Sequence, residues 1–285
     1  MFKTIRINHL FSRLLGGALL ATLLATPARA DLLISPTRVL LTEQQPVTQV
    51  ILRNTGALPR TYRMEWREMR RDDNGTYHSI DNPTPADRTA SHMLRYSPRQ
   101  ITLAAGETQI VRVQYQPQAG LSAGEYRSHL LFTTVGGASA NDADSASQRA
   151  EAVIRVSLAF SIPVIVRVGP PDDVQVSIPR VQPRVETNPA DGVTRLAFDV
   201  TIARSGAYSS FGDINVYMQT QRDTAPVLVG KSTDFAVFAD AAQRPITIPL
   251  RDDMRIPSGA WIRIAYDGKQ EFEGRTLAEQ VFQIQ

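Results

Sequence analysis

Residues 154–166 read Ile-Arg-Val-Ser-Leu-Ala-Phe-Ser-Ile-Pro-Val-Ile-Val, and this stretch decides the fold class of the chain. Every even position in it is large and apolar, whereas most odd positions are small or polar. A period of two is that of a β-strand, because successive side chains point to opposite faces of a sheet. At ~3.3 Å per residue the stretch spans roughly 40 Å, which is longer than most strands. We therefore predict one unusually long strand within an all-β protein.

Shorter alternating runs lie on both sides of this strand, separated by Gly, Pro, Asn and Asp. Residues 169–173, Gly-Pro-Pro-Asp-Asp, end the long strand and have the composition of a hinge. Several further short apolar runs follow between residues 174 and 284. This spacing predicts two immunoglobulin-like β-sandwich domains, residues 31–168 and residues 169–285.

The first 30 residues have the pattern of an export signal. A basic start is followed by a short apolar run, residues 14–25, and by the small-x-small triplet Ala28-Arg29-Ala30. These features predict a secretory signal peptide that is cleaved after Ala30, and export to the periplasm. The apolar run is too short to cross ~30 Å of hydrocarbon as a helix, so no membrane insertion is expected after cleavage.

The composition excludes several classes of function. The formal net charge is +3, but four basic residues and no acidic residue lie in the first 30 positions. The remaining 27 basic and 28 acidic residues give no excess that would favour nucleic acid. The chain has no cysteine, which excludes disulfides, thiolate metal sites and cysteine nucleophiles.

Signals for catalysis, metal ions and cofactors are absent from the sequence. It has no nucleophile elbow, phosphate-binding glycine loop or zinc-protease motif. The histidines after residue 30 are His78, His92 and His129, which are far apart in sequence, so no metal site is expected. The charged run 70–73 is expected to be a solvated loop. We therefore predict that the protein is not an enzyme and needs no cofactor.

The long strand has two possible interpretations. Its seven apolar side chains can fill the core of the first domain, as in any long inner strand. Alternatively, it lies at an exposed sheet edge, where its backbone can pair with another chain. A sandwich of this size seldom needs seven core positions from one strand, which favours the second interpretation.

Four motifs of the first domain form a pattern. They are Thr37-Arg38-Val39, Asn54-Thr55-Gly56, Pro98 with Leu103-Ala104-Ala105-Gly106-Glu107-Thr108-Gln109 and Val111-Arg112-Val113, and Phe160-Ser161-Ile162-Pro163-Val164. This pattern resembles the N-terminal domain of periplasmic pilus assembly chaperones, the PapD-like family of the chaperone–usher pathway. The motifs all lie in residues 31–168, whereas residues 169–285 agree with the family in length and strand content only.

The resemblance implies two immunoglobulin-like domains in a boomerang arrangement. It implies that the protein binds pilin subunits by donor-strand complementation and delivers them to an outer-membrane usher for assembly of a fimbrium. The donor strand would be residues 153–167, and a self-capping homodimer of the free protein is possible. The subunit-binding side chains would be Ile154, Val156, Leu158, Phe160, Ile162 and Val164.

The resemblance also implies that Arg38, in the cleft between the domains, binds the terminal carboxylate of the subunit. A guanidinium fork suits this task because it pairs with both carboxylate oxygens. Family members commonly have a lysine as second anchor, but Pro163 occupies the matching position here. Arg38 then acts alone, Arg155 or Arg167 replaces the lysine, or the subunit is held differently. Arg167, next to the hinge, could instead bridge the two domains.

A different class of function is the alternative: an exported adhesion or scaffold module built from two immunoglobulin-like domains. Such a module needs no long alternating edge strand followed by a bend, whereas a subunit chaperone does.

Overall fold

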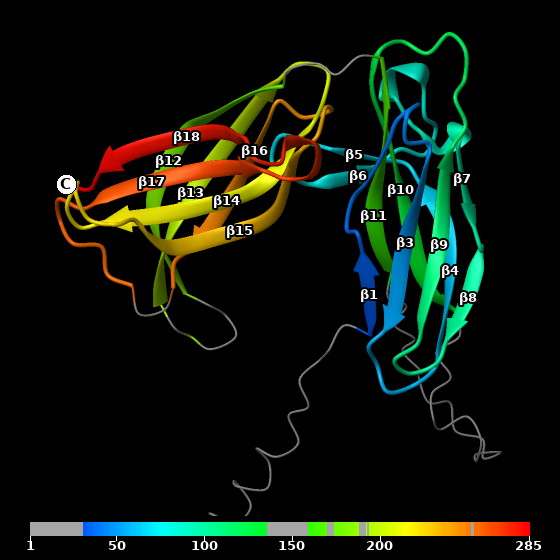
Figure 1. Ribbon diagram of the computed structural model, residues 1–285, viewed down its shortest axis with the longest axis horizontal. Helices are drawn as coiled ribbons and strands as arrows, with labels where there is room; N and C mark the ends of the chain where they lie inside the picture. Colours follow the sequence, from blue (N-terminus) through cyan, green and yellow to red (C-terminus); the bar gives the residue numbers. More distant parts are fainter. Residues whose placement is uncertain (1–30, 136–158, 170–173, 188–191, 193, 252–253) are drawn as a thin grey trace, which may run out of the picture.

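The computed structural model describes residues 31–135, 159–169, 174–187, 192, 194–251 and 254–285. Within them the chain forms β-strands joined by turns and short 3₁₀ helices. Two β-sandwiches lie with their long axes at a large angle to each other, which gives the molecule an L shape (Figure 1). The predicted all-β fold with two sandwich domains in a boomerang arrangement is therefore confirmed.

The first sandwich consists of two facing sheets. One has the order β1-β3-β9-β7 and the other the order β2-β11-β10-β4-β8. The first segment of the chain thus belongs to both sheets, because β1 pairs with β3 and β2 pairs with β11. The strands are β1 (Leu32–Ser35), β2 (Val39–Leu41), β3 (Val47–Asn54), β4 (Arg60–Arg67), β7 (Leu94–Ser97), β8 (Gln100–Leu103), β9 (Thr108–Tyr115), β10 (Gly124–Val135) and β11 (Ala159–Val168).

The second sandwich has a three-stranded sheet of order β12-β13-β16 and a four-stranded sheet of order β15-β14-β17-β18. All of the pairs in both sheets are antiparallel. The strands are β12 (Gln175–Thr187), β13 (Thr194–Ser205), β14 (Ser210–Gln219), β15 (Val227–Val237), β16 (Gln243–Pro249), β17 (Trp261–Gly268) and β18 (Thr276–Gln283).

A small hairpin extends from the first sandwich toward the second. It is formed by β5 (Met69–Arg71) and β6 (Tyr77–Ser79), which pair only with each other. Gly75 has φ +87 in its turn, a left-handed conformation that glycine adopts without steric cost. The short 3₁₀ helices are η2 (Pro85–Asp87), η3 (Ser91–Met93) and η4 (Gln270–Phe272).

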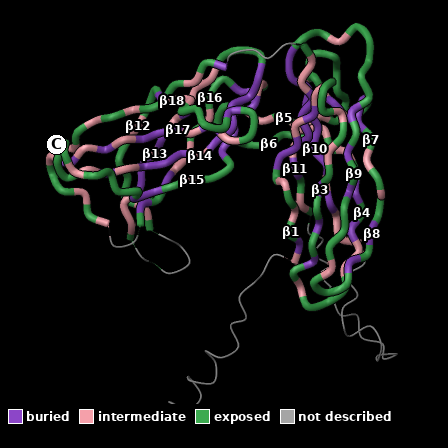
Figure 2. Tube along the Cα trace, viewed as in Figure 1, coloured by how far each residue is buried: buried purple, intermediate pink, exposed green. Residues whose placement is uncertain are grey.

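Each sandwich has its own hydrophobic core, and Figure 2 shows buried positions along the strands of both sandwiches. A third, smaller cluster of buried residues lies where the sandwiches meet. It contains Ile165 of β11 and, from the second sandwich, Phe211, Ala236, Phe238 and Phe272. The one large apolar side chain at an odd position of the long strand, Ile165, therefore packs against the other domain.

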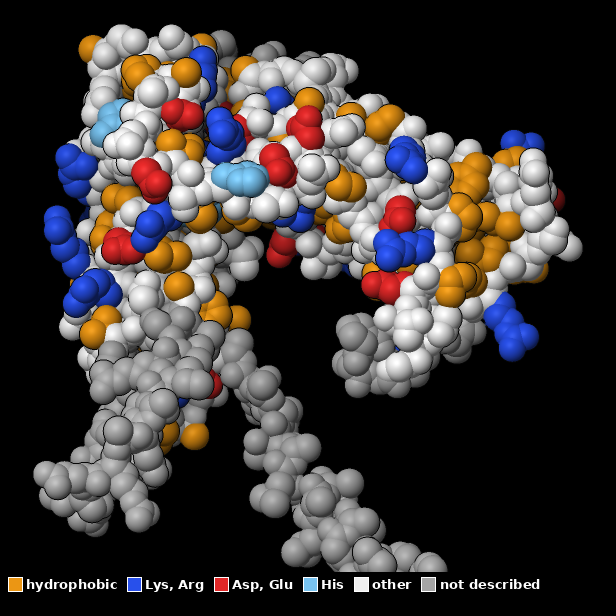
Figure 3. All heavy atoms as spheres, turned by 180° about the vertical axis from the view of Figure 1, so that it is seen from behind, with side chains coloured by type: hydrophobic (Ala, Val, Ile, Leu, Met, Phe, Trp, Pro, Cys, Tyr) orange, Lys and Arg blue, Asp and Glu red, His pale blue; other side chains and the backbone are white. Residues whose placement is uncertain are grey.

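The described residues include no helix long and apolar enough to cross a membrane. On the face seen in Figure 3, basic and acidic side chains are interspersed and do not gather into a patch of one sign.

Candidate functional site at the edge of β11 and the domain junction

The edge of β11 is covered along only part of its length. On one side, β10 pairs with it from Ala159 to Val168. On the other side, β2 pairs with it in parallel over three positions only, Val164 to Val166. Among the described residues, no strand covers this second side from Ala159 to Pro163. The first half of β11 is therefore an open sheet edge.

The alternation of β11 divides its side chains between two environments. From position 160 onward the even face points into the first sandwich, where Ile162 and Val164 are 3% and 0% exposed. Phe160 is half-buried and packs against the same core. The odd face turns Ile165 and Arg167 toward the second sandwich.

These positions limit which side chains of β11 are exposed. Ile162 and Val164 belong to the core of their own domain, so they leave no exposed surface for a partner in this structure. Phe160 keeps partial exposure at the start of the open edge. Ile154, Arg155, Val156 and Leu158 lie outside the described residues.

Arg38 lies at the point where the open edge meets β2. Because Val39 pairs with Val164 in a parallel register, Arg38 lies level with Pro163. Its side chain is 2% exposed, and its guanidinium group lies 4.7 Å from the ring centre of Phe211. The structure thus places Arg38 in the junction between the domains.

The guanidinium group of Arg38 is already occupied by a carboxylate of the second sandwich. Its Nη1 donates to Glu271 Oε2 at 3.0 Å, and its Nη2 donates to Glu271 Oε1 at 2.8 Å. Nη1 also donates to the side-chain oxygen of Gln270 at 2.7 Å. This fork-on-fork geometry is the strongest form of a guanidinium–carboxylate pair.

Arg167 joins the two domains through the same carboxylate. Its Nη2 lies 2.9 Å from Glu271 Oε1 and also donates to the carbonyl oxygen of Ser209 at 3.2 Å. Its Nε donates to Glu125 Oε2 at 3.2 Å, and this oxygen accepts hydrogen bonds from Ser209 N and Oγ. The two roles expected for Arg167 are an anchor for the subunit and a bridge between the domains. The contacts of this structure are those of a bridge.

The electrostatics of this cluster favour an ionised Glu271. Burial by itself raises the pKa of the Glu271 carboxyl group, but the guanidinium groups of Arg38 and Arg167 outweigh it, so the pKa lies below its ordinary value. Glu271 is therefore ionised near neutral pH while Arg38 and Arg167 remain in contact with it.

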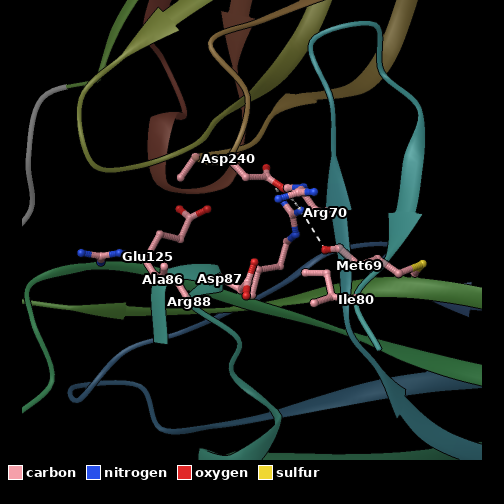
Figure 4. A pocket seen from close by; sticks show the side chains of 10 residues that line it. Met69, Arg70, Ile80, Ala86, Asp87, Arg88, Glu125 and Asp240 are labelled. Atoms are coloured by element: carbon pink, nitrogen blue, oxygen red, sulfur yellow. Dashed lines mark hydrogen bonds and ion pairs between the residues drawn. The ribbon is translucent and has the colours of Figure 1, made fainter. Parts of the chain in front are cut away.

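A second group of contacts lies beside a cavity of about 390 Å³ between the domains. Figure 4 shows Asp240 at the side of the second sandwich and Glu125 at that of the first. Arg127 of β10 donates to both oxygens of Asp240, at 3.0 and 2.6 Å, and lies 4.0 Å from the ring centre of Phe238. Arg71 N donates to the same carboxylate at 2.8 Å.

The hairpin also contacts the second sandwich through its turn. Asp73 Oδ1 accepts a hydrogen bond from Ala242 N at 2.8 Å. The expectation of a solvated charged loop at residues 70–73 is wrong for Arg71, which is half-buried in β5, whereas Asp73 is exposed as expected. The reason is that Arg71 packs against the other domain, which no local pattern indicates.

Sequence reasoning missed the acidic members of these clusters, Glu125, Asp240 and Glu271. Glu125 had a signal, because a single carboxylate beside Arg127 at the start of a strand rich in apolar residues needs a partner when buried. Glu271 lies in the short helix η4 and Asp240 lies in a turn, and the sequence around them gives no signal of a charged partner. Among the described residues, no group of His, Asp and Glu is arranged to hold a metal ion.

Comparison with known proteins gives structural matches only. No family model matches the sequence, and no curated protein matches it. The fold resembles the crystal structure of the CupB2 chaperone of Pseudomonas aeruginosa, with a TM-score of 0.44 and 13% identity over 89% of this chain and 100% of that chain.

Two further matches are chains in complexes. One is the CsuC–CsuE chaperone–tip adhesion subunit pre-assembly complex of Acinetobacter baumannii, with a TM-score of 0.40, 12% identity, and 90% and 98% coverage of the two chains. The other is the SafA pilin with the SafB chaperone of Salmonella enterica, with a TM-score of 0.40, 12% identity, and 91% and 99% coverage. Because these identities and TM-scores are low, we argue function from the geometry of this chain.

Proposed function

We propose that this chain is a non-enzymatic periplasmic chaperone that binds pilin subunits through the open edge of β11. It completes a subunit by donor-strand complementation and delivers it to an outer-membrane usher. The observation that carries the proposal is the unpaired edge from Ala159 to Pro163, with the guanidinium group of Arg38 at its end. The export signal expected in residues 1–30 supports the periplasmic location.

The position of β2 sets the point at which a bound strand ends. A partner strand beside residues 159–163 has to stop where β2 begins, at the level of Arg38. If that strand runs parallel to β11, its carboxyl end points at Arg38. A free terminal carboxylate there meets a guanidinium group, so the geometry favours a partner whose chain ends at this point.

Pro163 indicates which backbone groups of β11 point toward the open edge. Pro163 lies opposite His129 of β10 and has no N–H to donate. Proline is tolerated in a sheet where that missing N–H faces the free edge. Since backbone groups of alternate residues point the same way, those of Ala159 and Ser161 are then available to a partner strand.

The test is to block backbone pairing at this edge and to control separately for the loss of the serine hydroxyl group. Ser161 is exposed, so Ser161→Pro removes an outward N–H while leaving the core intact. The matched control, Ser161→Ala, keeps the N–H. We expect Ser161→Pro to reduce recovery of bound subunit from the periplasm by about tenfold or more, whereas Ser161→Ala binds normally.

The bound chain is identified by mass spectrometry, and both variants are compared for melting temperature. Equal recovery with the two variants would contradict edge pairing. Wild type that purifies only as a dimer, and becomes monomeric with Ser161→Pro, would instead indicate a self-capping homodimer. A chain that binds no pilin-type subunit at all would favour the adhesion or scaffold module.

A further inference from the structure

The guanidinium group of Arg38, which is proposed to bind a partner's terminal carboxylate, already binds a carboxylate of this chain. Both terminal nitrogens of Arg38 donate to Glu271, and Nη1 also donates to Gln270. The Arg38 side chain is 2% exposed, so a second carboxylate has no open approach to it. Binding at Arg38 therefore requires that Glu271 moves away.

Glu271 has a second cation to which it can remain paired. Arg167 Nη2 lies 2.9 Å from Glu271 Oε1, the same oxygen that Arg38 Nη2 contacts. If Arg38 turned to another carboxylate, Glu271 would keep its contact with Arg167, which it would share with Glu125. Removing one member of a buried ion pair is costly because it leaves a bare charge, and the shared guanidinium group of Arg167 reduces that cost.

The turn that carries Glu271 is suited to such a movement. Gln270 has φ +56, a left-handed conformation that non-glycine residues adopt at some cost. Phe272, in contrast, is 5% exposed and packs in the cluster between the domains. The side chains of Gln270 and Glu271 can thus change position while Phe272 keeps the turn in place.

The domains would stay together during this exchange. Arg127 and Asp240 form a separate bidentate pair, and the hairpin contacts Asp240 and Ala242 independently of Arg38. The loss of one Arg38–Glu271 contact therefore does not release the second sandwich.

We propose that Glu271 is an internal ligand of the partner-carboxylate site, and that a bound partner exchanges its own terminal carboxylate for that of Glu271 on Arg38. This inference rests on the proposed function of the β11 edge. It deepens that function, because only a partner with a free anionic end can compete with Glu271. A chain that ends in an amide, or continues past this point, gains nothing at Arg38.

Removing the charge of Glu271 removes the competitor. A neutral Glu271→Gln side chain binds guanidinium less strongly than a carboxylate does, so Arg38 becomes available at lower cost. We expect the affinity for a partner with a carboxylate end to rise about tenfold. The affinity for the same partner with an amide end should not change.

The experiment uses the full chain after signal cleavage and a synthetic strand, Val-Thr-Val-Thr-Val-Thr-Val-Phe, with either a carboxylate or an amide at its end. Binding of both peptides is measured by calorimetry for wild type, Glu271→Gln and Arg38→Ala. The matched control is Glu279→Gln, because Glu279 pairs with Arg263 on the exposed face of the second sandwich. Near-ultraviolet circular dichroism checks that each variant keeps its fold.

The outcomes separate this inference from the proposed function. We expect Glu271→Gln to strengthen binding of the carboxylate peptide alone, Arg38→Ala to abolish the difference between the two peptides, and Glu279→Gln to change neither. If wild type binds the peptides but Glu271→Gln leaves or lowers the carboxylate affinity, Glu271 only braces the domains and the exchange is wrong. If no variant binds either peptide, both the edge pairing and the exchange are contradicted.

Discussion

β11 and β12 both have a free edge, over Ala159 to Pro163 in β11 and along the whole strand in β12, but the residues at the two edges differ in kind. β12 forms one side of its sheet over Gln175–Thr187, and among the described residues no strand pairs with its outer side. It contains Pro179 and Pro183, which lack an N–H, and the charged residues Arg180 and Arg184. Prolines and charges are the usual means by which a protein prevents another chain from adding to a sheet.

The corresponding edge of β11 has little of this protection. No charged residue occurs between positions 156 and 166, and the only proline is Pro163, next to the point where β2 begins. The same chain therefore blocks one edge and leaves the other open. This contrast supports the proposed pairing of the open edge of β11 with another chain, because an unused edge of this kind favours aggregation.

The largest expected effect comes from placing the same charge at both edges. Phe160→Asp puts a carboxylate against the core at the start of the open edge, where Phe160 is half-buried. We expect subunit binding to fall by about a hundredfold, with a lower melting temperature, because an apolar side chain of this size contributes about 1.5–3 kcal/mol when buried.

Val185→Asp is the matched change on β12, where Val185 is 64% exposed. It should leave binding unchanged and stability within about 0.5 kcal/mol. Phe160→Leu, which keeps an apolar side chain, should still bind. Subunit recovery and thermal unfolding are measured for all three variants. Equal loss of binding with Phe160→Asp and Val185→Asp would remove the distinction between the two edges.

An intermediate effect is expected from a histidine that lies behind the open edge. His129 of β10 is opposite Pro163 and is 1% exposed, and neither of its ring nitrogens has a hydrogen-bond partner among the described residues. Burial, with the nearby Arg127 and Arg71, lowers its pKa from 6.5 to about 3. Between these two pKa values the unfolded chain binds a proton that the folded chain does not, so stability is present above pH 6.5 and falls as the pH decreases.

His129→Phe should remove this dependence while keeping an aromatic ring beside Tyr77, whose ring centre lies 5.2 Å away. We expect wild type to lose about 2 kcal/mol more than His129→Phe between pH 7.5 and pH 5. Urea unfolding followed by the fluorescence of Trp66, in a Trp261→Phe background, reports on the first sandwich alone. Identical losses in the two proteins would show that His129 is not the responsible group.

The smallest effect is expected from removing the protection of β12. Replacing Pro179 and Pro183 together by threonine adds two N–H groups to this edge without changing the charge. The folded monomer should keep its melting temperature to within a few degrees, but slow self-association on storage should increase. Self-association is measured by light scattering of concentrated protein. Unchanged scattering would mean that the charged residues of β12 are sufficient to prevent it.

The sequence predicts the local features of the β11 edge but not its limits. The alternation at residues 154–166 identifies a strand and divides its side chains between two faces, but it does not show that the even face packs into the core of its own domain. How much of that strand is covered depends on β2, a segment more than 100 residues earlier in the chain. The pairing of Arg38 with Glu271 spans 233 positions. No sequence periodicity links residues at such a distance. The pairing of the Glu271 carboxylate with Arg38 is therefore visible only in the folded chain.

The arginine contacts at the junction have a further consequence for ionic strength. The side chains of Arg38, Arg127 and Arg167 are only 2%, 8% and 12% exposed, whereas the pair between Arg67 and Glu65 is about half exposed on both sides. Salt weakens the interaction between exposed charges, with a screening length of about 10 Å at 0.1 M, but it screens buried pairs far less. We therefore expect the angle between the sandwiches, which these contacts hold, to be the same in dilute buffer and in concentrated salt.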